Sequence, residues 1–295
     1  MNVLIIGATG YIGTAIDEAL SARGHRTVSA ARSDSARDKL RARGSAFVSG
    51  DAANPATLIE PARAADAVVY CVQITDDDPW TVDSRALREI RKGLAGTENS
   101  FLYVSGAWVY GETGDTPATE DTPPNPPALV QRRLQLESET LQMGKLGIRA
   151  HIVRPGIVYG RGAGLPAMFV QSARERGAAT VFGTGENRWA TVALRDLGEL
   201  VALILERGRP GRAYNGVSAD HFQMKDIAEA ASRGAGAGGN TIRAPQELLG
   251  QLGDCLALDQ VVSAERAKAD LGWSPSCPSI VEELEHGSYL NAALA

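Results

Sequence analysis

The chain opens on Val3-Leu4-Ile5-Ile6-Gly7-Ala8-Thr9-Gly10-Tyr11-Ile12-Gly13, an apolar run followed by glycines at a spacing of three. The apolar residues predict a strand, and Thr14–Leu20 predicts the helix that follows it. Between them, Gly7 permits a tight turn, Gly10 a close approach of backbone to a pyrophosphate, and Gly13 close packing of helix on strand. The helix N-terminus adds N–H groups and a partial positive charge. We therefore expect a nucleotide to contact Gly7, Thr9, Gly10, Tyr11, Ile12 and Gly13.

Composition excludes several classes of protein. The 295 residues are 44% hydrophobic and 22% charged, which is ordinary for a soluble globular protein. The net charge of −5 gives no electrostatic attraction to nucleic acid or to an anionic membrane. Three scattered cysteines predict neither a disulfide framework nor a metal site. Met1 leads directly into a strand and no apolar run reaches membrane length, so we expect a cytoplasmic protein without a signal peptide.

The first half of the chain alternates short apolar strands with helical segments. The expected strands are Val3–Ile6, Arg26–Ala31, Ala46–Val48, Ala67–Cys71, Phe101–Val104 and Ile148–Val153. The expected helices are Tyr11–Arg23, Ser35–Arg43, Pro55–Ala64, Asp83–Gly96 and Pro127–Leu146. This alternation predicts an α/β protein with a doubly wound parallel sheet, a Rossmann fold. In such a sheet the ligand lies along the carboxyl ends of the strands.

Arg32 follows the second expected strand and bears on the choice of dinucleotide. Sites that prefer NAD place a carboxylate about 20 residues beyond the glycines, where it binds the ribose 2′-hydroxyl. Here Ala31 takes that position and Arg32 follows it. A guanidinium suits a 2′-phosphate, so we expect NADP(H) to be preferred over NAD(H). The alternative is a solvated arginine that begins a loop.

Further candidate contacts follow the third and fourth strands. Asp51, with Ala52, follows Phe47–Gly50, and its carboxylate is suited to accept from an adenine amino group. The alternative for Asp51 is a helix cap before Pro55. The fourth strand runs out in Cys71, Val72 and Gln73, where backbone would pass close to the cofactor ribose.

Several motifs together resemble the extended short-chain dehydrogenase/reductase family, also called the NAD-dependent epimerase/dehydratase family. They are Gly7–Gly13, Gly50-Asp51, Val104–Gly111 and Arg154–Gly160, and the resemblance covers essentially the whole chain. It implies a dinucleotide-dependent enzyme with a Ser/Thr, a Tyr and a Lys at its centre, the last two spaced Tyr-x-x-x-Lys. It also implies cofactor contacts from Arg133 and Pro155, and a dimer formed through helices that include the Pro127–Leu146 equivalent.

This chain departs from the family's catalytic pattern at every position. Leu129 stands where the tyrosine belongs, Arg133 where the lysine belongs, and Gly106 where the Ser/Thr belongs, with Ser105 beside it. No tyrosine in the chain has a lysine four residues later. Arg133 can still place a cation near the ribose, but it cannot relay a proton. Loss of a positioned acid/base costs roughly 10²–10⁴-fold in rate, so another group must act if carbonyl chemistry is retained.

Candidate replacements for the missing acid/base are spread along the chain. Tyr110 and Arg133 are the two that we assign to the catalytic site. The other candidates are Tyr159, Tyr214, His221 and the acidic run Asp76-Asp77-Asp78. Each has an alternative: packing for the tyrosines, local bonding for the histidine and a solvated loop for the aspartates.

The later part of the chain is expected to close over the substrate, as the resemblance implies. We expect residues 1–159 to form the dinucleotide-binding domain, with a return near 186–214. Residues 160–185 and 215–295 would form the substrate-binding lid. Candidate substrate contacts are Trp108, Tyr159 and Trp189, with Phe169 as further apolar wall and with Arg161 and Arg188 as ligands for an anionic or polar group.

The sequence therefore predicts an NADP(H)-binding oxidoreductase-like enzyme that acts on a small organic molecule through a non-standard acid/base site. Two alternatives stay open. One is a non-redox enzyme on the same scaffold, such as an isomerase, cyclase or lyase. The other is a catalytically silent NADP(H) sensor that regulates a partner. No basic arm favours a nucleic-acid role, and no metal is expected.

Overall fold

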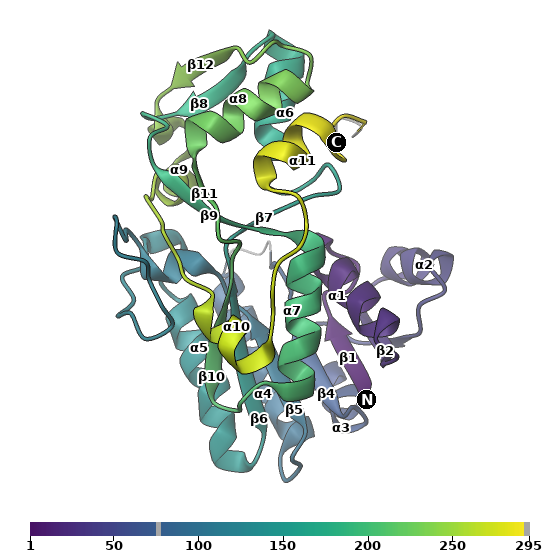
Figure 1. Cartoon of the computed structure of the whole chain (residues 1–295). Helices are drawn as coiled ribbons and strands as arrows, with labels where there is room; N and C mark the ends of the chain where they lie inside the picture. The colour runs from purple at the N-terminus through teal and green to yellow at the C-terminus, as the bar shows by residue number, and fades with distance from the viewer. Residues whose placement is uncertain (75–77, 292–295) are drawn as a thin grey trace. The chain divides into compact units, whose positions relative to one another are not determined.

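A seven-stranded sheet in the order β10-β6-β5-β4-β1-β2-β3 is the centre of the fold (Figure 1). The structure is a computed structural model that describes residues 1–74 and 78–291. The strands are β1 (Asn2–Ile6), β2 (Arg26–Ala31), β3 (Phe47–Ser49), β4 (Ala67–Tyr70), β5 (Ser100–Val104), β6 (Arg149–Pro155) and β10 (Arg212–Gly216). Neighbouring strands from β3 to β6 run parallel. The predicted doubly wound parallel sheet is thereby confirmed.

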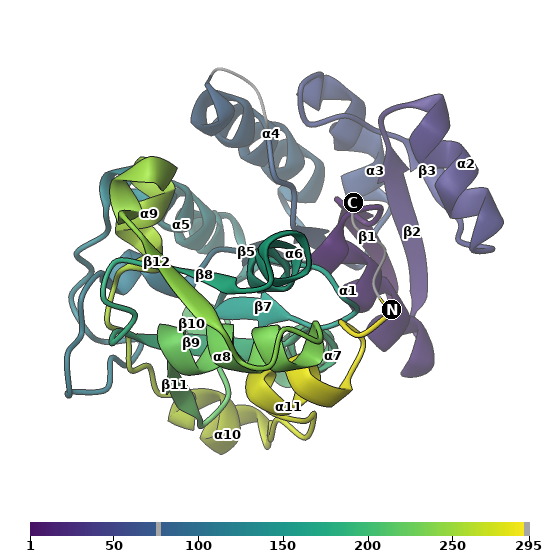
Figure 2. The ribbon, with the colours of Figure 1, turned by 90° about the horizontal axis from the view of Figure 1, so that it is seen from above.

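Helices cover both faces of this sheet because its strands are apolar on both sides. On one face, Leu4, Tyr70 and Phe101 pack against α3 (Ile59–Arg63), α4 (Pro79–Leu94) and α5 (Arg133–Gln142). On the other face lies α1 (Tyr11–Ala22), close to α7 (Leu194–Arg207) (Figure 1, Figure 2). Gly198 makes this approach possible, since a Cβ there would lie 2.7 Å from the Ala15 carbonyl oxygen.

Three of the expected helices differ from the structure. The helix expected at Asp83–Gly96 begins earlier, at Pro79, because Asp78 caps it, and ends at Leu94. Pro55–Ala64 divides into a 3-10 turn, η1 (Pro55–Leu58), and the short α3. Pro127–Leu146 was expected to be one helix, which is wrong: it consists of η3 (Ala128–Val130), α5 and η4 (Met143–Leu146). Pro127 has no N–H, and its carbonyl accepts from Val130 N at 3.0 Å, a three-residue bond that tightens the chain before α5 can begin.

The chain divides into two compact units. The first contains Met1–Ser105, Arg132–Val153 and Gly198–Tyr214; the second contains Gly106–Gln131, Arg154–Leu197 and Asn215–Ala295. The bounds differ from the expected domains: 106–131 lies with the second unit, and the return to the first begins at 198. The chain crosses between the units at each of these boundaries because neither unit is continuous in sequence.

The second unit is built from small sheets and helices. One sheet has the order β11-β9-β7 and another pairs β12 with β8. Its elements are η2 (Ala107–Tyr110), η3, β7 (Ile157–Tyr159), α6 (Ala167–Arg176), β8 (Ala179–Phe182), β9 (Arg188–Ala193), β11 (His221–Gln223), α8 (Met224–Gly234), β12 (Thr241–Ala244), η5 (Gln246–Leu249), α9 (Gln251–Leu256), α10 (Glu265–Leu271) and α11 (Ile280–His286). Gly234 lets α8 approach α11, since a Cβ there would lie 2.0 Å from the Leu284 carbonyl oxygen. Phe169 and Trp189 pack in the core, with ring centroids 5.5 Å apart.

No helix within residues 1–74 and 78–291 combines the length and apolarity that crossing a bilayer requires. The second helix of the first unit, α2 (Asp34–Ala42), lies beside β2 and is strongly charged. Ser33 caps its N-terminus by accepting from Ala36 N at 3.2 Å.

An ion-pair cluster between the end of α1 and α7 makes stability depend on pH. Arg23 Nη2 lies 2.6 Å from Glu206 Oε2, and the His25 ring lies 3.0 Å from Oε1. The hydrogen bond from Arg23 is the main reason that the pKa of Glu206 falls to about 2. A carboxyl group whose folded pKa is lowered stabilises the protein above its unfolded pKa of about 4.3. That contribution is lost as the pH falls from there towards about 2.

We expect Glu206→Gln to lower the thermal midpoint at neutral pH by roughly 2–4 °C, since screening by solvent limits such a pair to about 1 kcal/mol. Differential scanning calorimetry of both proteins at neutral pH and near the folded pKa checks this. The two midpoints should converge in acid. Asp38→Asn, which removes an exposed pair with Arg41 on α2, is the matched control and should change the midpoint little. An undiminished difference in acid would contradict the assignment.

Candidate dinucleotide-binding site

The glycine loop between β1 and α1 is so tight that a side chain is excluded at Gly7 and at Gly13. Gly7 has φ +104°, and a Cβ there would lie 2.6 Å from the Cys71 carbonyl oxygen. A Cβ on Gly13 would lie 2.1 Å from the Gly7 carbonyl oxygen, because the first turn of α1 rests on the loop. Gly10 N donates to Gly7 O at 3.0 Å and closes the turn. The loop therefore presents bare backbone at the place where the sequence predicted a pyrophosphate.

The N-terminus of α1 carries positive charge that its own residues do not neutralise. Gly10 is the N-cap, and in this fully described helix there is neither a capping side chain nor an acidic residue in the first turn. Thr14 Oγ1 donates to Gly10 O at 2.8 Å, so this hydroxyl stabilises the loop. A helix end of this kind suits an anion. The bare loop and the helix end together fit the pyrophosphate of a dinucleotide.

The sheet register brings the other expected contacts to the same edge. Ile6 pairs with Ala30 on one side and with Tyr70 on the other, and Ala31 pairs with Ser49. The residues that follow these positions are Arg32, Asp51, Ala52, Cys71, Val72 and Gln73, so all leave the sheet at the carboxyl edge. Arg32 is exposed, and within the described residues no hydrogen bond or ion pair holds its guanidinium.

Asp51 and Cys71 also have local structural roles. Asp51 Oδ1 accepts from Ala53 N at 3.0 Å, a turn that occupies one carboxylate oxygen. This bond is a local turn and not the helix cap given as the alternative, because Asn54 is the N-cap of η1 and no side chain caps that helix. Cys71 Sγ lies 3.3 Å from Ile6 O, and burial raises the pKa of its thiol to about 12. The thiol is therefore protonated at neutral pH and acts as a packing group beside Gly7.

Arg133 begins α5 and lies against a tyrosine pair that sequence reasoning missed. Its Nη1 is 3.5 Å from Tyr103 Oη, and its guanidinium carbon is 5.8 Å from the centroid of the Trp80 ring. The Tyr103 ring stacks on Tyr70 at 6.3 Å. Alternate positions on β4 and β5 bring these rings to the α4–α5 face, a signal that the strand pattern does carry. The Arg133 cation is therefore held at the start of α5 by residues of the first unit.

A buried carboxylate completes this group. Tyr70 Oη donates to Asp83 Oδ1 at 2.5 Å, and Asp83 is only 7% exposed. Burial raises the pKa of Asp83, and the hydrogen bond from Tyr70 and the charge of Arg133 oppose that rise. Burial also raises the pKa of Tyr103 to about 12. Both tyrosines are therefore neutral near pH 7, so the group holds Arg133 without supplying a ready base.

In the second unit, Tyr110 is buried and its hydroxyl is already bonded on both sides. It accepts from Arg154 Nη1 at 2.9 Å and donates to Asn215 Oδ1 at 2.7 Å. Burial raises the pKa of Tyr110 despite the neighbouring Arg154 cation. Pro155, the next residue, ends β6 and is itself buried. Tyr110 would have to exchange a partner before it could transfer a proton.

Some of the expected substrate residues are buried in the core, and one of them is only partly buried. Trp189 is 2% exposed, and its Nε1 donates to Leu256 O at 2.8 Å. Tyr159 is 1% exposed, and its hydroxyl donates to Pro278 O at 2.7 Å. Trp108 is half-buried, so its ring keeps some exposed surface. Arg188 is bound by Asp259 and Asp115 at 2.5 and 2.9 Å, which occupies its guanidinium.

The remaining candidate acid/base groups have local partners. Tyr214 is fully buried, and its hydroxyl accepts from Arg209 N at 2.9 Å. His221 Nε2 lies 3.0 Å from Val262 N, and burial lowers the pKa of this histidine. Asp78 caps α4 by accepting from Thr81 N at 3.3 Å. Asp76 and Asp77 lie outside the described residues.

The residues at the expected catalytic positions differ in their surroundings. Among the described residues, a Cβ on Gly106 would meet Pro155 O alone, at an ordinary 3.9 Å, so space does not demand glycine there. Ser105 Oγ is buried without a hydrogen-bond partner among residues 1–74 and 78–291. Leu129 lies half-buried in η3. The Ser105 hydroxyl is therefore buried and unsatisfied within the described residues, and Leu129 offers only an apolar side chain.

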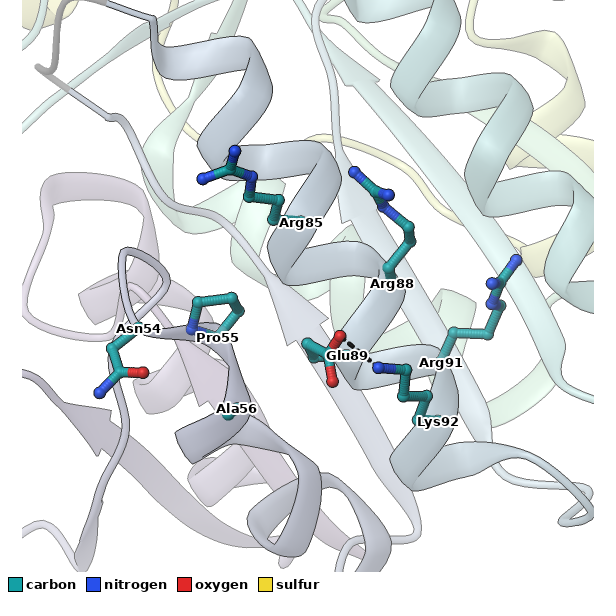
Figure 3. A pocket seen from close by; sticks show the side chains of 8 residues that line it. All are labelled: Asn54, Pro55, Ala56, Arg85, Arg88, Glu89, Arg91 and Lys92. Atoms are coloured by element: carbon teal, nitrogen blue, oxygen red, sulfur yellow. Dashed lines mark hydrogen bonds and ion pairs between the residues drawn. The ribbon is translucent and has the colours of Figure 1, made fainter.

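A basic groove lies apart from these residues, between η1 and α4. Its volume is about 540 Å³, and its lining consists of Asn54, Pro55, Ala56, Arg85, Arg88, Glu89, Arg91 and Lys92. Glu89 pairs with Lys92 at 2.5 Å. Figure 3 shows that the guanidinium groups of Arg88 and Arg91 point away from Asn54 and Pro55. The cations therefore do not converge on one ligand.

Comparison with known proteins agrees with this geometry. The model of the NAD dependent epimerase/dehydratase family matches residues 3–215. An uncharacterized protein of Schizosaccharomyces pombe is 28% identical over 98% of this chain and 100% of its own length. The dTDP-glucose 4,6-dehydratase of Bacillus anthracis, solved in complex with NAD, has a TM-score of 0.82 at 18% identity, over 98% of this chain and 96% of that one.

A second solved structure shows the same fold. The UDP-glucose 4-epimerase of Thermotoga maritima, solved with UDP-glucose, has a TM-score of 0.81 at 20% identity, over 98% of this chain and 97% of that one. These likenesses extend the fold to the whole chain, beyond the residues that the family model matches. The glycine loop, the parallel sheet and the match over residues 3–215 show that the chain belongs to the NAD dependent epimerase/dehydratase family.

Proposed function

We propose that the protein is an NADP(H)-binding enzyme that carries out oxidoreductase chemistry on a small organic molecule through a non-standard acid/base site. The observation that carries this proposal is the glycine cradle at the carboxyl edge of the sheet, where a Cβ on Gly7 or Gly13 would overlap backbone. Membership of the NAD dependent epimerase/dehydratase family supports dinucleotide-dependent chemistry. The solved dehydratase holds NAD, so the choice of NADP(H) rests on this chain's own residues.

Arg32 supports the preference for NADP(H). It leaves the sheet after β2, where a carboxylate would serve NAD, and its guanidinium has no partner within the described residues. A free fork of N–H donors matches a phosphate better than it matches a ribose hydroxyl. When bound, the nicotinamide supplies or accepts hydride. The residues of the chain would bind the pyrophosphate at the loop and hold the Arg133 cation at the start of α5.

The proton required by such a reaction has no obvious donor at the family's position. Leu129 cannot donate a proton, and Tyr110 is engaged by Arg154 and Asn215. Ser105 offers a hydroxyl that could polarise a carbonyl, since its Oγ lacks a partner within the described residues. We propose that Arg133 and Tyr110 are the catalytic groups, with exchange of a Tyr110 hydrogen bond on substrate binding.

The protein would be cytoplasmic and dimeric.

The test is to incubate the protein with NADPH and a broad panel of carbonyl compounds, and to follow the depletion of NADPH by its absorbance. Turnover of any compound with oxidation of NADPH supports the proposal. Tight NADPH binding without turnover of anything counts against an enzyme and favours the sensor. Turnover with unchanged cofactor absorbance favours the non-redox enzyme, for which the absence of the family tyrosine is the supporting observation.

A restored motif gives a second test. We expect Leu129→Tyr combined with Arg133→Lys to raise carbonyl reductase activity by roughly 10²-fold or more, because a positioned proton donor returns. The measurement is the initial rate of NADPH oxidation. Leu129→Phe with Arg133→Lys is the matched control, since it adds the ring without the hydroxyl. Equal rates in the two variants would show that the tyrosine hydroxyl does not reach a substrate.

A further inference from the structure

The chain leaves β7 through a tight turn, Gly160–Ala163, whose second residue has an unusual backbone. Ala163 N donates to Gly160 O at 3.2 Å and closes the turn. Arg161 has φ +54° and Gly162 has φ +67°, and positive φ at both central positions is the pattern of a type I′ turn. Within residues 1–74 and 78–291, Arg161 is the one non-glycine residue with positive φ. Its Cβ makes this conformation sterically costly, so glycine, asparagine or aspartate usually takes such a position.

Two residues that follow α11, Ser288 and Tyr289, hold this turn in place. Gly160 N donates to Tyr289 Oη at 2.9 Å, and the same hydroxyl donates to Ala163 O at 2.6 Å. Gly162 N donates to Ser288 Oγ at 2.8 Å. Tyr289 is 1% exposed, so packing fixes its ring and keeps its hydroxyl between the two ends of the turn. The backbone is therefore bonded on both sides of Arg161.

The Ser288-Tyr289 segment is itself anchored at two points. Ser288 Oγ donates to Glu283 Oε1 of α11 at 2.5 Å. Arg174, in the last turn of α6, donates from Nη2 to Tyr289 O at 2.7 Å and to Leu290 O at 2.8 Å. A strained backbone conformation persists only where the surrounding structure over-determines it. Here α6, α11 and the Ser288-Tyr289 segment supply that constraint.

Packing does not explain why an arginine occupies this turn. Arg161 is exposed, and glycine or asparagine would form the same turn at a lower steric cost. The apolar side chains that follow, Leu165 and Met168, are only partly buried, and they pack with Trp108 against the core cluster that contains Tyr159, the last residue of β7. A guanidinium beside partly exposed apolar side chains suits an organic molecule that carries an anionic group.

We propose that Arg161 binds an anionic oxygen group of the substrate, a carboxylate or a phosphate, and that Tyr289 is the positioning residue for Arg161. The proposal rests on the enzymatic function proposed above. The guanidinium would donate two parallel hydrogen bonds to the anionic group, which fixes its orientation as well as adding affinity. The rigid turn would present the cation in one direction, and this is the use of its strained backbone.

The experiment compares 4-carboxybenzaldehyde, 4-formylphenyl phosphate and the neutral methyl 4-formylbenzoate as substrates of the full chain, by the initial rate of NADPH oxidation. We expect kcat/KM for at least one anionic aldehyde to exceed that for the ester by about 10-fold or more, as a charged hydrogen bond allows. The aldehyde that is preferred tells whether the site favours carboxylate or phosphate.

Arg161→Asn should remove this preference by raising KM for the anionic aldehyde, and Arg161→Lys should retain part of it. Because asparagine tolerates the turn, Arg161→Asn should also melt roughly 2–4 °C higher than the wild type. Arg176→Asn, which replaces an exposed arginine of α6 in the same unit, is the matched control and should keep the full preference. Higher stability with the preference retained in Arg161→Asn would overturn the proposal.

Tyr289→Phe separates a positioning role from a merely structural one. Without the hydroxyl, hydrogen exchange at the Gly160 amide should accelerate about 10-fold or more, while exchange at Gly162, which is bonded to Ser288, should change less. The preference for the anionic aldehyde should fall with it, through KM and not through kcat. In the Arg161→Asn background, Tyr289→Phe should change the preference no further, because its effect passes through Arg161. A further loss in the double variant would contradict the role of Tyr289.

The outcomes for the wild type separate this proposal from the proposed function. If the wild type turns over no carbonyl compound at all, the proposed function itself fails. If it reduces the ester as well as both anionic aldehydes, only the assignment of Arg161 fails.

Discussion

Gly13→Ala is expected to reduce dinucleotide affinity by about 100-fold or more, because one added methyl group forces the loop and α1 apart. The new Cβ would lie 2.1 Å from Gly7 O and 2.7 Å from Gly7 C, and both are backbone atoms that cannot rotate away. Relief requires a shift of the turn that presents N–H groups to the pyrophosphate. Overpacking of this kind typically costs about 1–3 kcal/mol of stability. Titration with NADPH and NADH, with a thermal scan, checks both effects.

Two glycines serve as controls for Gly13→Ala. Gly144 has no neighbour within 4 Å of its added Cβ in the part of the chain that the structure describes, so Gly144→Ala should leave affinity unchanged. Gly10→Ala would place a Cβ 3.2 Å from Gly7 O, a contact that a small shift can relieve, and should fall between the two. Normal dinucleotide affinity in a folded Gly13→Ala protein would show that the loop is not the pyrophosphate site.

His151 is expected to make the protein markedly less stable in mild acid. The ring is fully buried in β6, and burial, reinforced by the nearby charge of Arg149, lowers its pKa to about 4. The unfolded chain binds this proton with a pKa of about 6.5, so it takes up more protons than the folded chain between these values. Stability is complete above about 6.5 and falls as the pH drops towards 4. The linkage amounts to about 2 kcal/mol at pH 5.

Urea unfolding of the wild type and of His151→Leu at neutral pH and at about pH 5 isolates this effect. We expect the variant to lose about 2 kcal/mol less than the wild type on acidification, because it has no proton to bind. His286→Leu is the matched control, since that side chain is 79% exposed. It should keep the full acid dependence of the wild type. Parallel losses in wild type and His151→Leu would show that other groups control acid stability.

The fold was predictable because its core strands are continuous apolar runs joined by helical segments. Val3–Ile6 and Ala67–Tyr70 are buried on both faces, and the pattern shows this without tertiary information. The Pro127–Leu146 prediction failed because helical periodicity does not reveal where three-residue hydrogen bonds replace four-residue ones. The two consecutive prolines that end at Pro127 were the sequence signal that a regular helix does not begin there. The division into units was not predictable, since it depends on contacts between distant segments.

The candidate site was predictable where the local sequence alone fixes the backbone geometry. It was not predictable where the geometry depends on contacts between distant segments. The glycine loop and the residues after β2 and β4 follow from spacing and register. The bonds of Tyr289 to the turn after β7 could not be found, because 126 or more positions of the chain separate the bonded residues. The bonds of Tyr110 to Arg154 and Asn215 were equally hidden, since these residues are far apart in sequence. A motif indicates which groups are able to bind a ligand, and only the packed structure shows which of them already have hydrogen-bond partners.

The crossings between the two units affect how the chain folds during synthesis. The first unit needs Gly198–Tyr214, which supplies most of α7 and the start of β10, so its last edge strand emerges only after two segments of the second unit, Gly106–Gln131 and Arg154–Leu197, have been made. Sequence separations this large slow folding, because loops must close before distant strands pair. Until then β6 is an unpaired, apolar edge that other chains can join. A nascent chain stalled before residue 212 is therefore expected to aggregate or to recruit chaperones.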